Sequence, residues 1–307
     1  MCRERGVNRV NRREFIGLSA ATAGVAALGG CRSVFGGTSF YGPTIRDRLW
    51  MWGHHPAKGE TTFKGEFKAK WGGKAVDQAE GCRMMGIPND CVIRWGNMPR
   101  YPWGGYFEQF RSLKRFSFGI TDGASESTRE KMRIAFEELK PNFPNFTGCF
   151  LDDYFRPADI GQNALGIEQI AEEVHAHDLR LSVVLYSDQD GLKPEFRPKL
   201  ASCDEVSFWF WRSANIDTMG DQVRKCRDFV GAGKDLLLGL YMWDYTLSAP
   251  VEGRLMERQL AFAERFLKDG TVSGLIFHPS YLASLEVPAV RLAKDWIAAH
   301  GDEKWGC

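Results

Sequence analysis

Short apolar runs alternate with longer amphipathic stretches along most of this chain, and that alternation limits its possible folds more than any other feature. Eight runs rich in apolar, aromatic or β-branched residues predict strands. They are Arg48–Gly53, Asp90–Trp95, Arg115–Ile120, Gly148–Asp152, Arg180–Tyr186, Glu205–Trp211, Asp235–Trp243 and Ser273–His278. Segments of helical periodicity lie between them, at Gly73–Met85, Ser125–Leu139, Ile160–His177, Ile216–Val230, Pro250–Leu267 and Val287–Ala299. Regular alternation of strand and helix indicates a parallel sheet.

The number and spacing of the strands favour a closed barrel over an open sheet. Eight units starting about 32 residues apart match a (β/α)₈ barrel of roughly 250 residues. An open doubly wound sheet is the alternative, but it usually carries a glycine-rich phosphate turn after its first strand. Here the first strand runs into Trp52–Pro56, which is not such a turn. We therefore predict an α/β fold, a single (β/α)₈ TIM barrel over residues 47–307.

The first thirty residues do not follow this pattern. The pair Arg12-Arg13 is followed by the acidic residue Glu14. After it comes Phe15–Gly30, an uncharged stretch rich in alanine and glycine. A basic start, a modest apolar region and small residues at its end are the layout of a signal peptide. The stretch is shorter than the ~20 apolar residues of a membrane helix. It resembles the bacterial twin-arginine export signal, and its end, Leu28–Cys31, resembles a lipobox.

These resemblances imply export by the twin-arginine route, lipidation of Cys31 and a membrane-anchored protein in the periplasm or at the cell surface. The alternative is an ordinary signal peptide that contains a cysteine. Residues 1–30 are accordingly predicted to be a signal peptide, and residues 31–46, rich in Gly, Ser and Thr, a flexible tether. Without the five Arg and two acidic residues of the leader, 40 basic and 39 acidic residues become 35 and 37. This balance argues against nucleic acid as a partner.

Cysteine spacing and short motifs exclude several classes of site. The cysteines beyond Cys31 are Cys82, Cys91, Cys149, Cys203, Cys226 and Cys307, and none are spaced C-x-x-C, so a zinc ribbon is not expected. An exported protein can pair some of them, and buried free thiols are the alternative. The chain has no G-x-S-x-G elbow, P-loop or dinucleotide fingerprint. We therefore predict no cofactor.

The predicted strand ends carry acidic and aromatic side chains, and active sites of (β/α)₈ barrels lie at the C-terminal ends of the strands. Sugar rings stack on aromatic side chains through their apolar faces, and their hydroxyls hydrogen-bond to polar groups. This chemistry predicts a carbohydrate substrate. The candidate substrate-binding residues are Trp52, His54, Arg94, Trp95, Asp122, Tyr186, Trp209, Trp211, Trp243 and His278.

The strongest motif is the apolar strand that ends in Asp152 and Asp153. Burying carboxylates is costly unless something uses them. Adjacent strand residues point to opposite faces, so both can serve one site only if the strand bends at its end. The alternative is one functional Asp beside one that caps a helix or pairs with an arginine. The pair resembles that of N-acetylhexosaminidase-type barrel glycosidases, which implies that Asp152 orients an acetamide group and Asp153 is the acid/base.

Other arrangements remain open. Retaining glycosidases that place carboxylates on strand four and on strand six or seven also fit, and Asp244 is then the partner, because strand six ends without a carboxylate. No glutamate stands at these ends, unlike in the most common barrel glycosidases. Glycoside hydrolysis needs one protonated and one ionised carboxyl group. We predict a glycoside hydrolase with Asp152, Asp153 and Asp244 as its catalytic carboxylates.

Two further classes of function remain as alternatives. Side chains of His54, His55, Asp152, Asp244 and His278 that gathered on one rim would suit zinc or manganese. That arrangement is similar to metal-dependent sugar isomerase barrels, which imply Glu and His ligands after strands four, seven and eight, and only His278 matches. The other alternative is a lipoprotein that binds glycans without hydrolysing them, which does not need the Asp pair.

Overall fold

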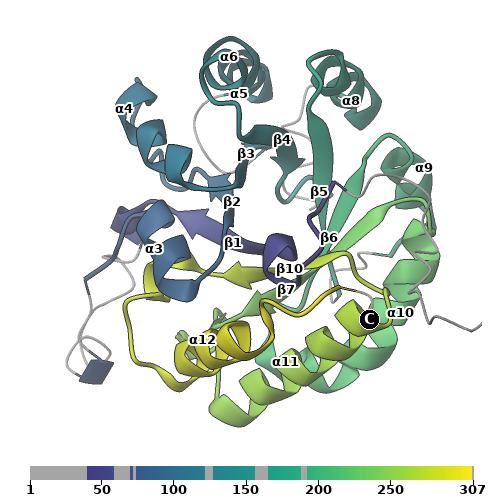
Figure 1. Ribbon diagram of the computed structural model, residues 1–307. Helices are drawn as coiled ribbons and strands as arrows, with labels where there is room; N and C mark the ends of the chain where they lie inside the picture. The colour runs from purple at the N-terminus through teal and green to yellow at the C-terminus, as the bar shows by residue number, and fades with distance from the viewer. Residues whose placement is uncertain are drawn as a thin grey trace, which may run out of the picture. The chain divides into compact units, whose positions relative to one another are not determined.

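The protein is a (β/α)₈ TIM barrel, as the sequence predicts. A computed structural model describes residues 40–58, 70–71, 74–121, 127–155, 165–187 and 192–305. Eight parallel strands close in the order β1-β10-β7-β6-β5-β4-β3-β2, and helices surround them (Figure 1). The predicted signal peptide (residues 1–30), Cys31 and Asp122 lie outside the described residues.

The observed strands follow the predicted runs closely. They are β1 Leu49–His54, β2 Asn89–Ile93, β3 Arg115–Thr121, β4 Phe146–Leu151, β5 Arg180–Tyr186, β6 Glu205–Trp209, β7 Asp235–Tyr241 and β10 Gly274–His278. Every residue of β1, β2 and β10 is buried. Strands covered on both faces need near-continuous apolar runs, which explains why the sequence reveals them.

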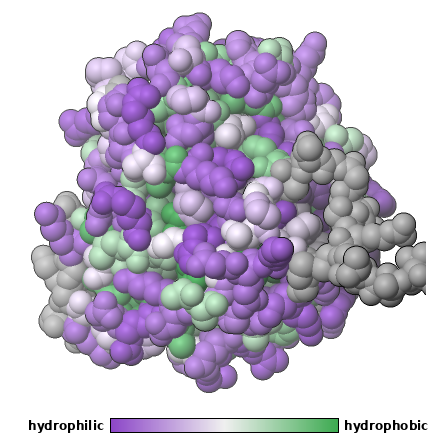
Figure 2. Space-filling view, viewed as in Figure 1, coloured by the Kyte–Doolittle hydropathy of each residue, from purple (hydrophilic) through white to green (hydrophobic). Residues whose placement is uncertain are grey.

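Amphipathic helices cover the outside of the barrel. They are α3 Gln78–Met85, α4 Gly104–Phe107, α5 Thr128–Ile134, α6 Lys140–Asn142, α8 Ile167–Ala176, α9 Arg197–Leu200, α10 Met219–Val230, α11 Gly253–Lys268 and α12 Pro288–His300. In α11 the buried side chains recur every three or four residues, from Met256 to Leu267. Ser127 caps α5 by accepting a hydrogen bond from the Glu130 N–H. The polar faces of the helices make the visible surface mainly hydrophilic (Figure 2).

The seventh strand is shorter than predicted. It ends at Tyr241, and Trp243–Asp244 forms a separate short strand, β8, which pairs antiparallel with β9 (Ala249–Pro250). The Met242 N–H donates to the His278 carbonyl, and the Val251 N–H donates to the Met242 carbonyl. The chain therefore leaves the barrel wall two residues before the predicted end.

The segment before β1 closes the N-terminal end of the barrel. Tyr41 and Ile45 are buried, so the packed domain includes part of the segment 31–46 that we assigned to the tether. The Phe40 ring lies against the guanidinium groups of Arg115 and Arg180, with the guanidinium carbons 4.9 and 4.4 Å from the ring centroid. The Tyr41 hydroxyl donates a hydrogen bond to the Glu205 carboxylate. We call residues 40–46 the plug.

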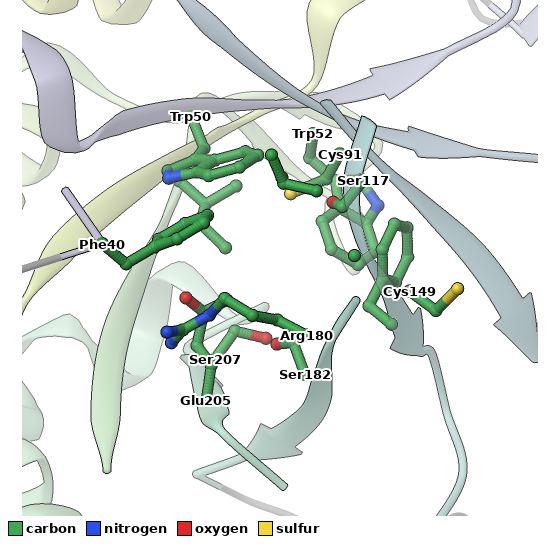
Figure 3. Close-up of a pocket in the computed structure, with 14 residues that line it drawn as sticks. Phe40, Trp50, Trp52, Cys91, Ser117, Cys149, Arg180, Ser182, Glu205 and Ser207 are labelled. Atoms are coloured by element: carbon green, nitrogen blue, oxygen red, sulfur yellow. The ribbon is translucent and has the colours of Figure 1, made fainter. Parts of the chain in front are cut away.

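The C-terminal residues hold the plug in place. The Ile45 N–H donates to the Glu303 carbonyl, and the Trp305 N–H donates to the Pro43 carbonyl, both over 2.9 Å. Behind the plug lies a chamber of about 30 Å³, on which the side chains of Phe40, Arg180 and Glu205 converge (Figure 3). This volume has room for one or two water molecules.

Two further features of the fold concern its cysteines and its helices. The five cysteines within the described residues, Cys82, Cys91, Cys149, Cys203 and Cys226, are buried free thiols, so the alternative of free cysteines holds for them. No helix in the described ranges combines the length and apolar composition needed to cross a membrane.

Candidate functional site

A cavity of about 200 Å³ opens at the C-terminal ends of the strands. Its lining comes from seven of the eight strands or the connections that follow them: Trp52, His54, Lys58, Ile93, Trp95, Asp152, Asp153, Tyr186, Trp209, Tyr241, Tyr245 and His278. The cavity therefore combines carboxylates, imidazoles, phenols, one lysine and three indoles. It lies where (β/α)₈ barrels place their active sites.

Both carboxylates of the β4 motif line this cavity. The strand ends at Leu151, and Asp153 has a left-handed backbone conformation with φ 52°. This bend brings Asp152 and Asp153, which an extended strand would point to opposite faces, to the same site. The Thr121 hydroxyl donates to the Asp152 backbone carbonyl over 2.9 Å, which fixes the end of the strand. The Tyr186 hydroxyl donates to Asp153 Oδ1 over 2.9 Å, which orients that carboxylate.

Aromatic rings form the floor of the cavity. The Trp52 ring centroid lies 5.0 Å from that of Trp209 and 4.8 Å from that of Phe150, and the Trp209 ring contacts Tyr241 at 5.3 Å. The Trp209 indole packs directly over Gly239, where an added Cβ would lie 2.1 Å from the ring. Trp52 lines both the cavity and the chamber behind the plug, so the aromatic floor separates them.

Two neutral histidines form the wall built by β1 and β10. The His54 and His278 rings stack with centroids 5.3 Å apart, and the Tyr245 hydroxyl lies 3.2 Å from His278 Nε2 and 3.1 Å from the Tyr281 hydroxyl. Burial, reinforced by the charge of Lys58, lowers the pKa of His54 to about 3. Burial, then the charges of His54 and Lys58, lower the pKa of His278 as well. At neutral pH both rings are uncharged hydrogen-bonding groups.

Lys58 and Trp95 lie together on the rim formed by β1 and β2. The Lys58 ammonium is 3.4 Å from the Trp95 ring centroid, a cation–π contact. Lys58 is half-buried, and burial lowers its pKa. Lys58 was missed in the sequence because it follows His54 by one short turn and does not stand directly after the strand. Tyr241 and Ile93 were missed as well.

The predicted site residues divide into three groups. Those that line the cavity are Asp152, Asp153, Trp52, His54, Trp95, Tyr186, Trp209 and His278. Arg94, Trp211, Trp243 and Asp244 do not line it. Asp122 is outside the described residues. Arg94 instead supports the following loop, where it donates to the carbonyls of Pro99 and Asn97 and lies over the Trp103 ring.

Asp244 differs most from its predicted catalytic role. It is buried, and its two oxygens accept hydrogen bonds from the Ser213 N–H and hydroxyl, the Thr246 N–H and hydroxyl, and the Leu247 N–H. Burial by itself raises the pKa of this carboxyl, but the hydrogen bonds outweigh it and lower the pKa to about 2. A carboxylate so fully bonded joins two loops, and we omit it from the proposed catalytic set.

Three of the residues proposed above as possible metal ligands, His54, Asp152 and His278, line the cavity, but they are not placed to hold a metal ion together. Within the described ranges, no group of three or more His, Cys, Asp or Glu side chains is placed to hold a metal ion. His54 and His278 face each other, but Asp244 is engaged elsewhere.

Comparison with known proteins identifies the fold and no family. Neither protein-family models nor curated proteins match this chain. A xylanase-α-amylase inhibitor protein aligns with a TM-score of 0.53 and 11% identity over 83% of this chain and 98% of its own. A zinc-bound amidohydrolase from Burkholderia multivorans aligns with a TM-score of 0.52 and 12% identity, covering 83% and 93%. An α-L-arabinofuranosidase from Thermotoga maritima, in complex with arabinose, gives 0.52 and 10%, covering 86% and 72%. At these identities the likeness shows the fold alone.

Proposed function

We propose that this protein is a glycoside hydrolase that acts outside the cytoplasm, anchored through a lipid on Cys31. The observation that carries the enzymatic part is the placement of Asp152 and Asp153 in one cavity with an aromatic floor. Export and lipidation rest on the resemblance of the N-terminal sequence to a twin-arginine signal and a lipobox. The cavity of about 200 Å³ is smaller than the roughly 300–1,000 Å³ of drug-sized ligand sites, which suits one enclosed sugar unit.

The two carboxyl groups have different roles in this proposal. Asp153 in its protonated form donates its proton to the glycosidic oxygen as the bond from C1 to that oxygen breaks. Asp152 in its ionised form stabilises the positive charge that develops on the sugar. A water molecule then adds to C1 and returns a proton to Asp153. Tyr186 positions Asp153 through its hydrogen bond, and Trp52 and Trp209 support the apolar face of the sugar.

The test is hydrolysis of an oligosaccharide panel by the wild-type protein and by Asp153→Asn. General acid catalysis contributes roughly 10²–10⁴-fold, so we expect kcat to fall by about that factor while ligand affinity changes little. The matched control is Asp178→Asn. Asp178 also has a left-handed conformation, φ 51°, but it is exposed at the end of α8 and does not line the cavity, so its variant should keep full turnover.

Glycan binding without hydrolysis is the second candidate, and the aromatic floor favours it equally. The same panel separates the two. A wild-type protein that binds oligosaccharides but releases no product supports the binding function and overturns the hydrolase. A protein that hydrolyses glycans equally well with Asp153→Asn disproves the role of that residue. A protein that neither binds nor hydrolyses any glycan excludes both candidates.

A further inference from the structure

The charged groups of the cavity lie on two separate sides. Asp152 and Asp153 follow β4, and Lys58 follows β1. In the closed barrel, β1 and β4 are separated by β2 and β3 in one direction and by β10, β7, β6 and β5 in the other. The carboxylates and the ammonium group therefore reach the same cavity from strands that are not neighbours.

Lys58 supplies the positive charge of the described lining. The other basic side chains there are His54 and His278, and both are neutral at ordinary pH because they are buried beside the lysine. The ammonium is half-buried and held over the Trp95 ring at 3.4 Å. A cation–π contact fixes the position of a cation without removing its charge. Partial burial also reduces screening by salt.

The position of Lys58 favours a particular class of ligand. A ligand that fills the cavity lies beside the Lys58 ammonium, and a group of opposite charge is attracted to it most strongly. Hydrogen bonds between two charged groups are roughly twice as strong as those between neutral groups. Trp95 is 42% exposed beside the lysine, so it offers an apolar surface next to the same point. An aromatic surface beside a cation matches a sugar ring that carries an anionic group.

We propose that Lys58 and Trp95 form a subsite for a sugar that carries an anionic substituent, a carboxylate or a sulfate ester. This inference rests on the proposed function, because it takes the occupant of the cavity to be a saccharide. It assigns a substrate class, acidic glycans. Their negative group lies at the β1–β2 side of the mouth, away from the catalytic pair.

The experiment measures binding of matched oligosaccharides to the full chain in an Asp153→Asn background, which keeps the ligands intact. The array contains neutral oligosaccharides, counterparts in which one sugar is oxidised to the uronate, and counterparts with one 6-sulfate. We expect roughly tenfold tighter binding of an acidic member than of its neutral match, with a preference that weakens as NaCl is raised. The uronate and sulfate members show which anion the subsite takes.

Variants of Lys58 connect the preference to this residue. Lys58→Met keeps the apolar stem but removes the charge, and should bring the acidic-to-neutral affinity ratio close to one. Lys58→Arg keeps the charge and should restore most of the preference. The control is Lys225→Met, which changes an exposed lysine on the outer face of α10 and should leave the ratio unchanged.

Each outcome bears on the inference separately from the proposed function. Equal binding of acidic and neutral glycans by the parent protein overturns the anionic subsite and leaves the hydrolase intact. A preference that survives Lys58→Met overturns the role of Lys58. An absence of binding to every oligosaccharide overturns both the subsite and the proposed function.

Discussion

Trp209 occupies the floor of the cavity because its neighbour on β7 has no side chain. The two strands pair with Trp209 beside Gly239, and the indole fills the space that a Cβ would take. The aromatic surface on which a sugar would rest thus depends on a glycine in the adjacent strand.

Gly239→Ala should therefore displace the Trp209 ring. Overpacking of a core typically costs about 1–3 kcal/mol, and we expect a loss of that size in the free energy of unfolding, measured by urea denaturation. A change in near-ultraviolet circular dichroism should accompany it, with weaker glycan binding. Gly233→Ala is the control, because a Cβ there meets no atom within 4 Å. An unfolding free energy equal to that of the wild type would contradict this account.

Sequence patterns could identify the residues of the Asp pair but not the bend that unites them. Two adjacent carboxylates at a strand end indicate a site, whereas the left-handed conformation of Asp153 is a backbone feature that the residue types do not show. Lys58 escaped prediction for a related reason. It follows its strand by several residues, and only the folded turn returns its side chain to the cavity.

The Asp244 carboxylate joins two loops, the connection between β7 and α11 and the connection between β6 and α10. Asp244 lies in the β8–β9 ribbon and accepts hydrogen bonds from Ser213 across the barrel rim and from Thr246 and Leu247 within its own turn. These two loops border the mouth, so their mutual attachment keeps that side of the cavity in shape.

Asp244→Ala should destabilise the fold. Hydrogen bonds to a charged group contribute about 1.5–3 kcal/mol, and we expect a loss of roughly that size at pH 7. The pKa of Asp244 is about 2 in the folded protein, below its ordinary value, so its contribution is complete above about pH 4 and disappears as the pH falls toward 2. Urea denaturation at several pH values should show the two proteins converging in that interval.

The control for this prediction is Asp269→Ala. Asp269 is exposed and accepts one hydrogen bond, from the Thr271 N–H, in the turn after α11. Its removal should change stability little at any pH. If Asp244→Ala and Asp269→Ala had equal effects, Asp244 would not be the attachment between the two loops.

The sequence predicted a strand correctly where the strand is buried along its length. The prediction failed where a local strand pairing redirects the chain. All eight barrel strands coincide with apolar runs, because both faces of each strand are covered. The run through Trp243 was predicted to continue β7, since its residues are of strand type. The β8–β9 pairing, which depends on Ala249 and Pro250, redirects the chain and gives Asp244 its structural role.

At the scale of the whole domain, the first and last segments of the described barrel domain meet at its closed end. Thr44 and Lys304 form an antiparallel bridge, and the Arg48 guanidinium stacks on the Trp305 ring at 3.7 Å. The plug was assigned to the tether because the segment 31–46 as a whole is rich in Gly, Ser and Thr. Its C-terminal partners lie more than 250 residues away in the sequence, as in the hydrogen bond between Arg46 and Asp302, and local patterns do not show such contacts.

A chain that begins at Asp47 should be less stable than one that begins at Phe40. The shorter form loses buried Tyr41 and Ile45, and burial of one large apolar side chain contributes about 1.5–3 kcal/mol. It also removes the hydrogen bond that Tyr41 donates to half-buried Glu205. We expect a lower midpoint of thermal unfolding, and equal midpoints would show that the plug contributes nothing to the closure of the barrel.

The plug lies at the opposite end of the barrel from the cavity. It is the first described part of the chain, and it lies at the closed end, whereas Asp152 and Asp153 lie at the open one. A lipid on Cys31, as proposed, would thus be joined to the domain through its sealed side, opposite the mouth.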